Sequence, residues 1–245
     1  MKHDMRAFYD DPAERRKWGA ELVEFGLSPC EEKFVAAHFR PGARVLDVGC
    51  GGGREAFPLA AAGFDVTAVD YTAEFVEACR AGAAARAMNV AVQQADVLSL
   101  PFADESFDHV MMVGQLLGHV RPRENRLRAL REIRRVMRPG AAIVSTNAVE
   151  RRPAYAAFFF AAHLARRFHN PDALEPYDAY VRRVGGKLPR GESRPIFHWY
   201  RSVDFRRDAA EAGWRVVEMA RRWEHEPPPP EASTHGETFY VLRKE

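Results

Sequence analysis

Short runs dominated by apolar residues recur along this chain, and between them apolar residues return at helical spacing. The short runs predict buried strands, because a strand covered on both faces of a sheet is apolar almost throughout. They are residues 44–48, 64–70, 90–94, 110–113, 142–146, 214–219 and 238–243.

The intervening stretches predict helices. The clearest is residues 122–137, where every third or fourth residue is apolar and one face packs on a sheet. Residues 55–62, the stretch from residue 73 onward and the segment that ends at 212–213 predict three more. Strands that alternate with helices indicate an α/β domain.

Composition narrows the class of protein. The chain has 245 residues, enough for one α/β domain with a sizeable core. The net charge is only +2, so no global field favours nucleic acid or a membrane as partner. Its three cysteines form no C-x-x-C motif, so neither a zinc site nor a disulfide framework is indicated. Residues 1–4 lead into no signal-peptide pattern, and we expect a cytoplasmic protein.

The strand at 44–48 runs directly into four glycines within five residues. Glycine lets a ligand approach the backbone closely, so this strand, loop and following helix predict a nucleotide-binding turn. The spacing is G-x-G-x-G, and Arg54 stands where the dinucleotide fingerprint requires glycine, which disfavours an NAD-dependent oxidoreductase. Asp47, two residues before the first glycine, would repel a pyrophosphate and attract an ammonium group.

Asp70 closes the next strand. A carboxylate at this place accepts hydrogen bonds from both hydroxyls of an adenosine ribose. Tyr71 is placed to lie along the ribose or the adenine. The alternative is that Asp70 only caps the helix that begins near residue 73, but the glycine motif at this spacing favours the ribose. Asp96 and Val97 come directly after the third predicted strand, at the same end of the sheet as Asp70.

These motifs, together with residues 100–108 (LPFADESFD), resemble the class I S-adenosylmethionine (SAM)-dependent methyltransferases, and among them the small-molecule, methyltransferase type 11-like branch. The resemblance is strong over residues 40–147 and looser over 196–243. It implies a Rossmann-like, doubly wound seven-stranded α/β sheet, mostly parallel with an antiparallel last strand. It also implies SAM as cofactor, S-adenosylhomocysteine as product and no metal.

The resemblance further assigns cofactor contacts. It implies that Asp96 takes the adenine amino group and that the backbone N–H of Val97 meets the ring. The residues expected to contact the cofactor are Asp47, Gly49, Cys50, Gly51, Gly53, Asp70, Tyr71, Asp96, Val97 and Gln115.

The implied reaction is methyl transfer to an oxygen, nitrogen or carbon nucleophile of a small molecule. An oxygen or nitrogen acceptor needs its proton removed, and a histidine suits that task near pH 7. His119 and His198 are the candidate bases because their segments reach the strand ends, and Tyr200 or Tyr9 is the candidate for orienting the acceptor. A lone histidine is more often structural, so all of these are candidates only.

Other functions stay open. Methylation of RNA or protein has one support, the arginines of the helix at 122–137. Acids share that helix, so we interpret it as a solvated face and expect no nucleic-acid partner. A non-catalytic SAM-binding module is the third possibility. We expect no membrane association and a monomer or homodimer.

The predicted organisation is a single methyltransferase domain, residues 1–245. A helical cap at 1–38 precedes a SAM-binding core at 39–149 and an insertion at 150–197, and residues 198–245 complete the sheet. The insertion combines an aromatic-rich helix at 154–168 with a stretch rich in glycine and proline. Such a segment is typical of a lid over the acceptor, and equally of a helix packed on the core or a dimer contact.

Overall fold

The computed structural model describes residue 9, residues 11–149, residues 157, 161 and 164, and the ranges 175–180, 196–226 and 236–245. Within these ranges, every helix is too short or too polar to span a bilayer. Most of the expected aromatic helix at 154–168 lies outside the described residues, so its role as a lid stays a prediction.

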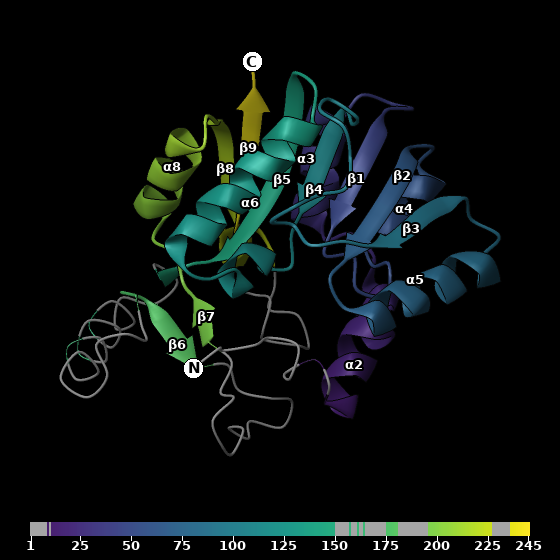
Figure 1. Cartoon of the computed structure of the whole chain (residues 1–245), viewed down its shortest axis with the longest axis horizontal. Helices are drawn as coiled ribbons and strands as arrows, with labels where there is room; N and C mark the ends of the chain where they lie inside the picture. The colour runs from purple at the N-terminus through teal and green to yellow at the C-terminus, as the bar shows by residue number, and fades with distance from the viewer. Residues whose placement is uncertain are drawn as a thin grey trace.

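A seven-stranded sheet forms the centre of the molecule, in the order β3-β2-β1-β4-β5-β9-β8 (Figure 1). The strands are β1 Arg44–Val48, β2 Asp65–Asp70, β3 Val90–Gln94, β4 His109–Met112, β5 Gly140–Asn147, β8 Arg215–Arg221 and β9 Glu237–Lys244. β9 lies antiparallel between β5 and β8, and the other neighbouring pairs are parallel. The predicted Rossmann-like sheet with an antiparallel last strand is therefore confirmed.

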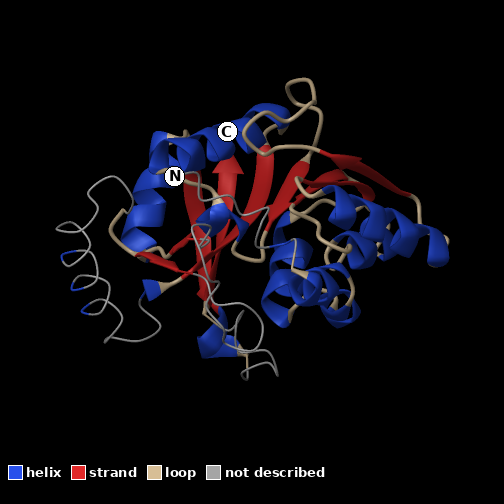
Figure 2. Ribbon diagram, turned by 60° about the horizontal axis from the view of Figure 1, so that its bottom comes forward, coloured by secondary structure: helices blue, strands red, loops and turns tan. Residues whose placement is uncertain are grey.

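Helices cover both faces of this sheet (Figure 2). The β1 neighbours Val45 and Leu46 are both fully buried but belong to two different cores, because successive side chains of a strand point to opposite faces. α6 and α8 close the core around Leu46, and α3, α4 and α5 close the core around Val45. These helices are α3 Pro29–His38, α4 Ala56–Ala61, α5 Ala73–Ala85, α6 Arg123–Val136 and α8 Ser202–Glu211.

Helices also form the N-terminal cap, as predicted. It consists of α2 (Pro12–Gly19), the 3-10 helix η1 (Glu21–Phe25) and α3. α2 packs against α5, and its last turn lies over the glycine loop, where the backbone N–H of Gly52 donates to the Trp18 carbonyl at 3.0 Å. The cap is thereby fixed to the edge of the sheet at which the parallel strands end.

Two short strands occupy part of the insertion, for which the sequence predicted only a helix and a loose stretch. β6 (Asp178–Tyr180) pairs antiparallel with β7 (Ile196–His198) as a separate two-stranded sheet (Figure 1). Strands of three residues leave little periodicity in a sequence, and their pairing is not local. Beyond β7, the backbone N–H of Tyr200 donates to the Asn147 carbonyl at 2.8 Å, which attaches this small sheet to the end of β5.

Candidate active site

A cavity of about 300 Å³ lies where β1, β2 and β4 end, beneath the N-terminal cap. In open α/β sheets, ligands bind at this edge. Most of the expected cofactor contacts line the cavity: Gly49, Cys50, Gly51, Asp70, Tyr71, Asp96 and Val97. The structure therefore brings together side chains and backbone from three separate strand ends.

The glycine loop forms one wall of the cavity and could not carry larger residues. Gly49 and Gly51 have φ angles of 80° and 52°, in the left-handed region that favours glycine. A Cβ on Gly52 would lie 2.1 Å from the Gly19 carbonyl oxygen of α2. The loop thus presents bare backbone to the cavity on one side and to the cap on the other.

Asp70 stands at the end of β2 with its carboxylate fixed by two backbone donors. The N–H of Gly51 donates to one oxygen at 3.0 Å, and the N–H of Thr72 donates to the other at 2.8 Å. Burial raises the pKa of this carboxyl, whereas the two donors act in the opposite direction. Asp70 therefore braces the turn into α5 and also lines the cavity, and its contact with a ribose stays a prediction.

Asp96 and Val97 lie on the far side of Asp70, where β3 ends. One Asp96 oxygen accepts the N–H of Leu98 at 2.9 Å, which fixes the carboxylate beside the cavity. Leu98 and the half-exposed Tyr71 add apolar surface next to it. A pair of carboxylates separated by flat apolar surface fits a ribose and an adenine.

Three expected contacts are not among the lining residues: Asp47, Gly53 and Gln115. Asp47 is 1% exposed, and its Oδ2 has no hydrogen-bond partner among the described residues. The backbone N–H of Gln115 donates to Ser145 Oγ at 3.1 Å. These three lie behind the wall, and their contact with the cofactor stays a prediction.

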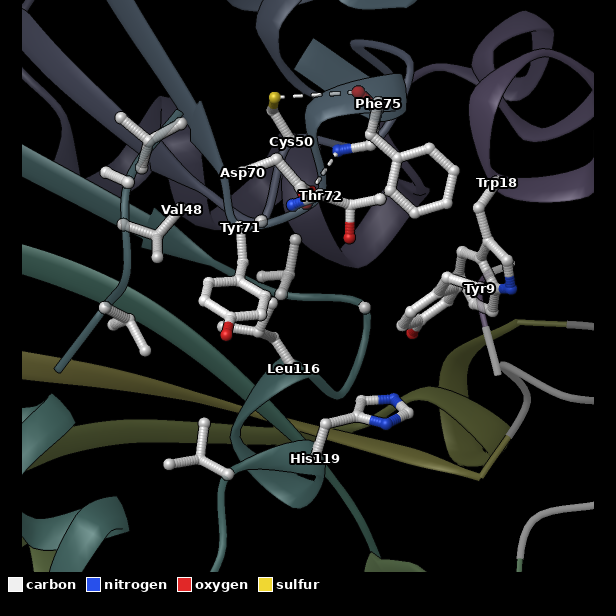
Figure 3. A pocket seen from close by; sticks show the side chains of 18 of the residues that line it. Tyr9, Trp18, Val48, Cys50, Asp70, Tyr71, Thr72, Phe75, Leu116 and His119 are labelled. Carbon is white, nitrogen blue, oxygen red and sulfur yellow. Dashed lines mark hydrogen bonds between the residues drawn. The ribbon is translucent and has the colours of Figure 1, made fainter. Parts of the chain in front are cut away.

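His119 lines the same cavity from the 3-10 helix η2 (Leu116–His119), which follows β4. Figure 3 shows its imidazole across the pocket from Asp70, on the side of Tyr9 and Trp18. Its ring meets Phe197 edge-on at 4.6 Å between centroids and lies 6.0 Å from the Tyr9 ring. Its Nδ1 is buried and has no hydrogen-bond partner within the described ranges. Burial lowers the pKa of His119 to about 4, so the ring is neutral at pH 7.

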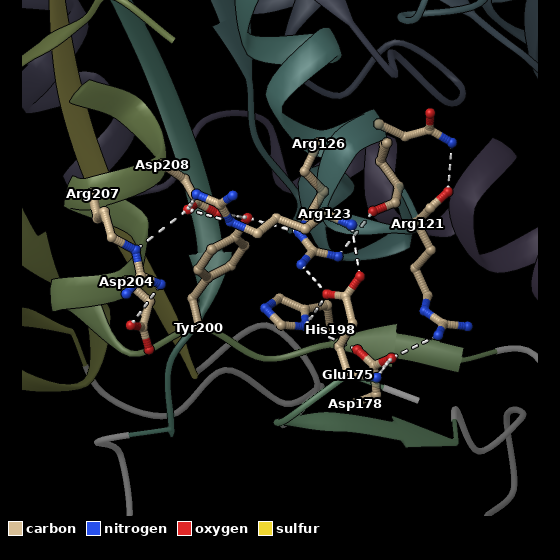
Figure 4. Close-up of polar contacts among 12 residues, drawn as sticks. Arg121, Arg123, Arg126, Glu175, Asp178, His198, Tyr200, Asp204, Arg207 and Asp208 are labelled. Atoms are coloured by element: carbon tan, nitrogen blue, oxygen red, sulfur yellow. Dashed lines mark hydrogen bonds and ion pairs between the residues drawn. The ribbon is translucent and has the colours of Figure 1, made fainter. Parts of the chain in front are cut away.

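His198 and Tyr200 belong to a buried ionic network beside the cavity and do not line it (Figure 4). His198 Nδ1 lies 2.8 Å from Asp178 Oδ1. Burial lowers the pKa of His198, whereas Asp178 acts in the opposite direction. The Tyr200 hydroxyl accepts from Arg126 Nε at 2.9 Å and donates to Asp208 Oδ2 at 3.3 Å. The catalytic roles predicted for His198 and Tyr200 stay predictions that this placement does not favour.

The cavity also holds residues that the sequence did not single out. Trp18 and Phe75 supply aromatic surface next to Tyr9, and Arg121 and Glu55 supply charge. The Arg121 guanidinium pairs with Asp178 at 2.8 Å, which joins the cavity wall to the network around His198. Trp18 sits near the end of a mostly polar cap helix, and no motif marks it as a ligand contact.

Comparison with known proteins shows which families have similar sequences and structures. The model of the family described as "Methyltransferase domain" matches residues 45–140. A demethylmenaquinone methyltransferase of Beutenbergia cavernae is 33% identical over 144 residues, which is 58% of this chain and 57% of that protein. An O-methyltransferase of Aspergillus sclerotiorum is 38% identical over 103 residues, 41% of this chain and 38% of that protein. The chain thus spans about half the length of curated relatives that it matches, or less.

Solved structures share the fold. A SAM-dependent methyltransferase of Methanosarcina mazei superposes with a TM-score of 0.71 at 19% identity, covering 89% of this chain and 98% of that one. A TehB-like SAM-dependent methyltransferase of Corynebacterium glutamicum gives 0.61 at 17% identity, covering 98% and 100%.

The matched domain and the shared architecture agree. Residues 45–140 match the methyltransferase domain family, and the chain has the fold of solved SAM-dependent methyltransferases, whose cofactor is SAM.

Proposed function

We propose that this protein transfers the methyl group of SAM to an oxygen, nitrogen or carbon atom of a small-molecule acceptor. One observation carries the proposal: a single cavity is lined both by the glycine loop with Asp70 and by His119 with its aromatic neighbours. A cofactor held by the first wall and an acceptor held against the second would meet without leaving the cavity.

SAM supplies an already activated methyl group, so the chain must chiefly align the acceptor and exclude water. Alignment of two reactants can supply about 7–11 kcal/mol of a barrier. Tyr9, Trp18 and Phe75 form a mostly apolar wall opposite the strand ends, which excludes water and favours an acceptor with a flat or apolar body.

His119 receives the polar end of the acceptor in this proposal. A neutral imidazole has one nitrogen that accepts a hydrogen bond, and the buried Nδ1 of His119 lacks a partner among the described residues. An acceptor hydroxyl or amine would donate to it. A base with a pKa of about 4 is too weak to ionise a hydroxyl in advance, so the proton moves to His119 only as the methyl bond forms.

The arginine-rich helix α6 supports a small acceptor over RNA. Two of its outer arginines are paired with acids: Arg131 with Glu211, and Arg135 with both Glu132 and Asp104. Paired guanidinium groups hold little charge in reserve for phosphates. The names of the relatives, an O-methyltransferase and a demethylmenaquinone methyltransferase, also support a small molecule. Cytoplasmic location and a monomeric or homodimeric state stay predictions.

The test is turnover of methyl-labelled SAM with a panel of phenols, quinols, amines and carbon acids. We expect label in at least one acceptor, and loss of that label in the Asp70→Asn variant. Label that appears instead in RNA or protein would show that the acceptor is a macromolecule and not a small molecule. SAM binding without transfer to any acceptor would favour the non-catalytic module.

A further inference from the structure

Behind the glycine loop lies a cluster of buried carboxylates that the proposed reaction does not use. Its members are 5% exposed or less and come from four elements: Glu31 of α3, Asp47 of β1, Glu55 before α4 and Glu237 of β9. Carboxylates are rarely this buried unless each is paired with a cation.

The cations present do not match these acids one for one. Arg54 binds both oxygens of Glu31, at 2.8 and 2.9 Å, and also pairs with Glu55. Arg222 of α9 (Arg222–His225) pairs with Glu237 at 2.9 Å, but it shares its charge with Glu226. Two guanidinium groups thus pair with four carboxylates, and the fifth, Asp47, has an ion pair with neither within the described ranges.

The shortage of positive charge reaches the cavity wall. Arg54 and Glu55 line the cavity, and Arg54 divides its charge between Glu55 and Glu31. Glu31, Asp47 and Glu237 do not line it. Asp47 Oδ2 is a buried acceptor with no donor among the described residues. Burial and the charge of Glu55 raise the pKa of the Asp47 carboxyl well above its ordinary value. Among the described residues, the Glu55 and Asp47 carboxyl groups thus have one cation beside them at the cavity wall, Arg54, and its charge is shared with Glu31.

We propose that Glu55, backed by Asp47, receives the ammonium group of SAM and releases a proton when SAM binds. This inference rests on the proposed function, because it takes the cavity to be the SAM site. Two carboxylates in a poorly hydrated wall resist ionising together, so the free protein retains a proton. A bound ammonium favours the ionised form of both, and the proton leaves.

The charged groups that face Glu55 set the pH range of this exchange. They are Arg54 beside it, Glu31 from α3, Asp47 from β1 and Glu237 from β9. Burial raises the pKa of Glu55 to about 7, and Glu31 and Glu237 add to that while Arg54 opposes it. Because binding releases a proton below this pKa, affinity for SAM should rise from about pH 5.5 to about pH 7 and then level off. Above about pH 8 the ligand's own amino group loses its charge, and affinity should fall.

The test is titration calorimetry of the full chain with SAM at pH 6.5, in two buffers that differ in ionisation enthalpy. The difference in heat gives the number of protons released per SAM bound. We expect more than about half a proton for the wild type, and close to none for Glu55→Gln, with binding at least about tenfold weaker. Glu237→Gln is the matched control, because burial also raises the pKa of Glu237 to about 7 but Glu237 does not line the cavity. It should still release a proton on binding SAM, but a smaller fraction than the wild type, because the charge of Glu237 no longer raises the pKa of Glu55.

Three ligands separate the two cations of SAM. SAM carries an ammonium and a sulfonium, S-adenosylhomocysteine only the ammonium, and methylthioadenosine neither. Glu55→Gln should weaken SAM and S-adenosylhomocysteine equally and leave methylthioadenosine unchanged. Weakening of SAM alone would overturn the ammonium assignment in favour of the sulfonium.

The remaining outcomes also decide the inference. SAM that binds to the wild type with no proton release, and with affinity independent of pH, would overturn the inference and leave the proposed function standing. No SAM binding at any pH would overturn both. If Glu55→Gln does not fold, as judged by circular dichroism, the wild-type proton count and its pH profile settle the question without it.

Discussion

Two histidines, the half-buried His119 and the buried His198, lie at the same edge of the sheet in opposite surroundings. His119 lines the cavity among aromatic rings, and its Nδ1 has no partner within the described ranges. His198 stands in an ionic network, with Asp178 2.8 Å from its Nδ1 and Glu175 at 3.8 Å. Burial lowers the pKa of both rings.

The difference teaches which kind of buried polar atom is available for chemistry. A buried acceptor without a partner is unfavourable unless a ligand supplies the donor. A buried imidazole bound to a carboxylate already has its partner and stabilises the fold that holds it. On this reasoning we propose that His119 serves the acceptor and that His198, paired with Asp178 of β6, holds β6 and β7 together.

The largest effect is expected for His119→Ala. It should reduce turnover about 10²–10⁴-fold at unchanged affinity for SAM, because the acceptor loses the group that orients it and takes its proton. The measurement is single-turnover transfer from labelled SAM together with calorimetry. His119→Asn, which keeps a hydrogen-bond acceptor, should recover part of the loss. Wild-type turnover in His119→Ala would remove His119 from the mechanism.

Asp70→Ala should act on the opposite wall of the cavity. Loss of charge-assisted hydrogen bonds to the ribose should weaken SAM binding by about 1.5–3 kcal/mol, roughly tenfold to 150-fold. Thermal denaturation is needed alongside, since the backbone N–H groups of Gly51 and Thr72 also lose their acceptor. A folded variant with an unchanged dissociation constant would show that Asp70 only braces the turn.

His198→Ala should give the reverse of the His119 result. Asp178 would lose a buried partner, so we expect a loss of about 1–3 kcal/mol in the free energy of unfolding, measured by urea denaturation. Turnover of the folded variant should stay within about threefold of wild type, because the side chain does not line the cavity. A loss of turnover as large as that of His119→Ala, without loss of stability, would reverse the assignment of roles.

The smallest effect is expected from pH. Since the pKa of His119 is about 4, its ring stays neutral from pH 6 to pH 9, and turnover at saturating SAM should change less than about twofold from this residue. Turnover should fall only as the pH drops through about 4, because a protonated imidazole no longer accepts a hydrogen bond. An inflection near pH 6.5 that disappears in His119→Asn would contradict this. An ordinary histidine changes its charge between about pH 5 and pH 8, which is where a sequence-based argument expects a histidine base to titrate. Burial moves the titration of His119 below that range.

Much of the fold and of the cofactor wall follows from local sequence signals. The apolar run of β1 and the glycines after it indicate a strand followed by a glycine loop. Asp70 falls at the end of the next strand, at the spacing that the motif requires. The wall formed by Tyr9, Trp18 and Phe75 cannot be predicted from local sequence signals. Trp18 enters it only because the end of α2 lies over the glycine loop.

The buried network shows the same limit. His198 resembles a catalytic residue in the sequence because its partner Asp178 lies 20 residues earlier, in a strand too short to predict. Likewise, no sequence pattern shows that Glu31, Glu55 and Glu237 converge on Arg54, since they belong to three elements that meet only in the folded chain.

The central claim is that one cavity holds SAM between Asp70 and His119, and a crystal structure of the complex with S-adenosylhomocysteine tests it most directly. The account predicts ribose hydroxyls on the Asp70 carboxylate, the adenine beside Asp96 and Val97, and the thioether sulfur facing the side of the cavity that His119 lines. A ligand bound elsewhere, or bound here with the sulfur directed away from His119, would contradict it.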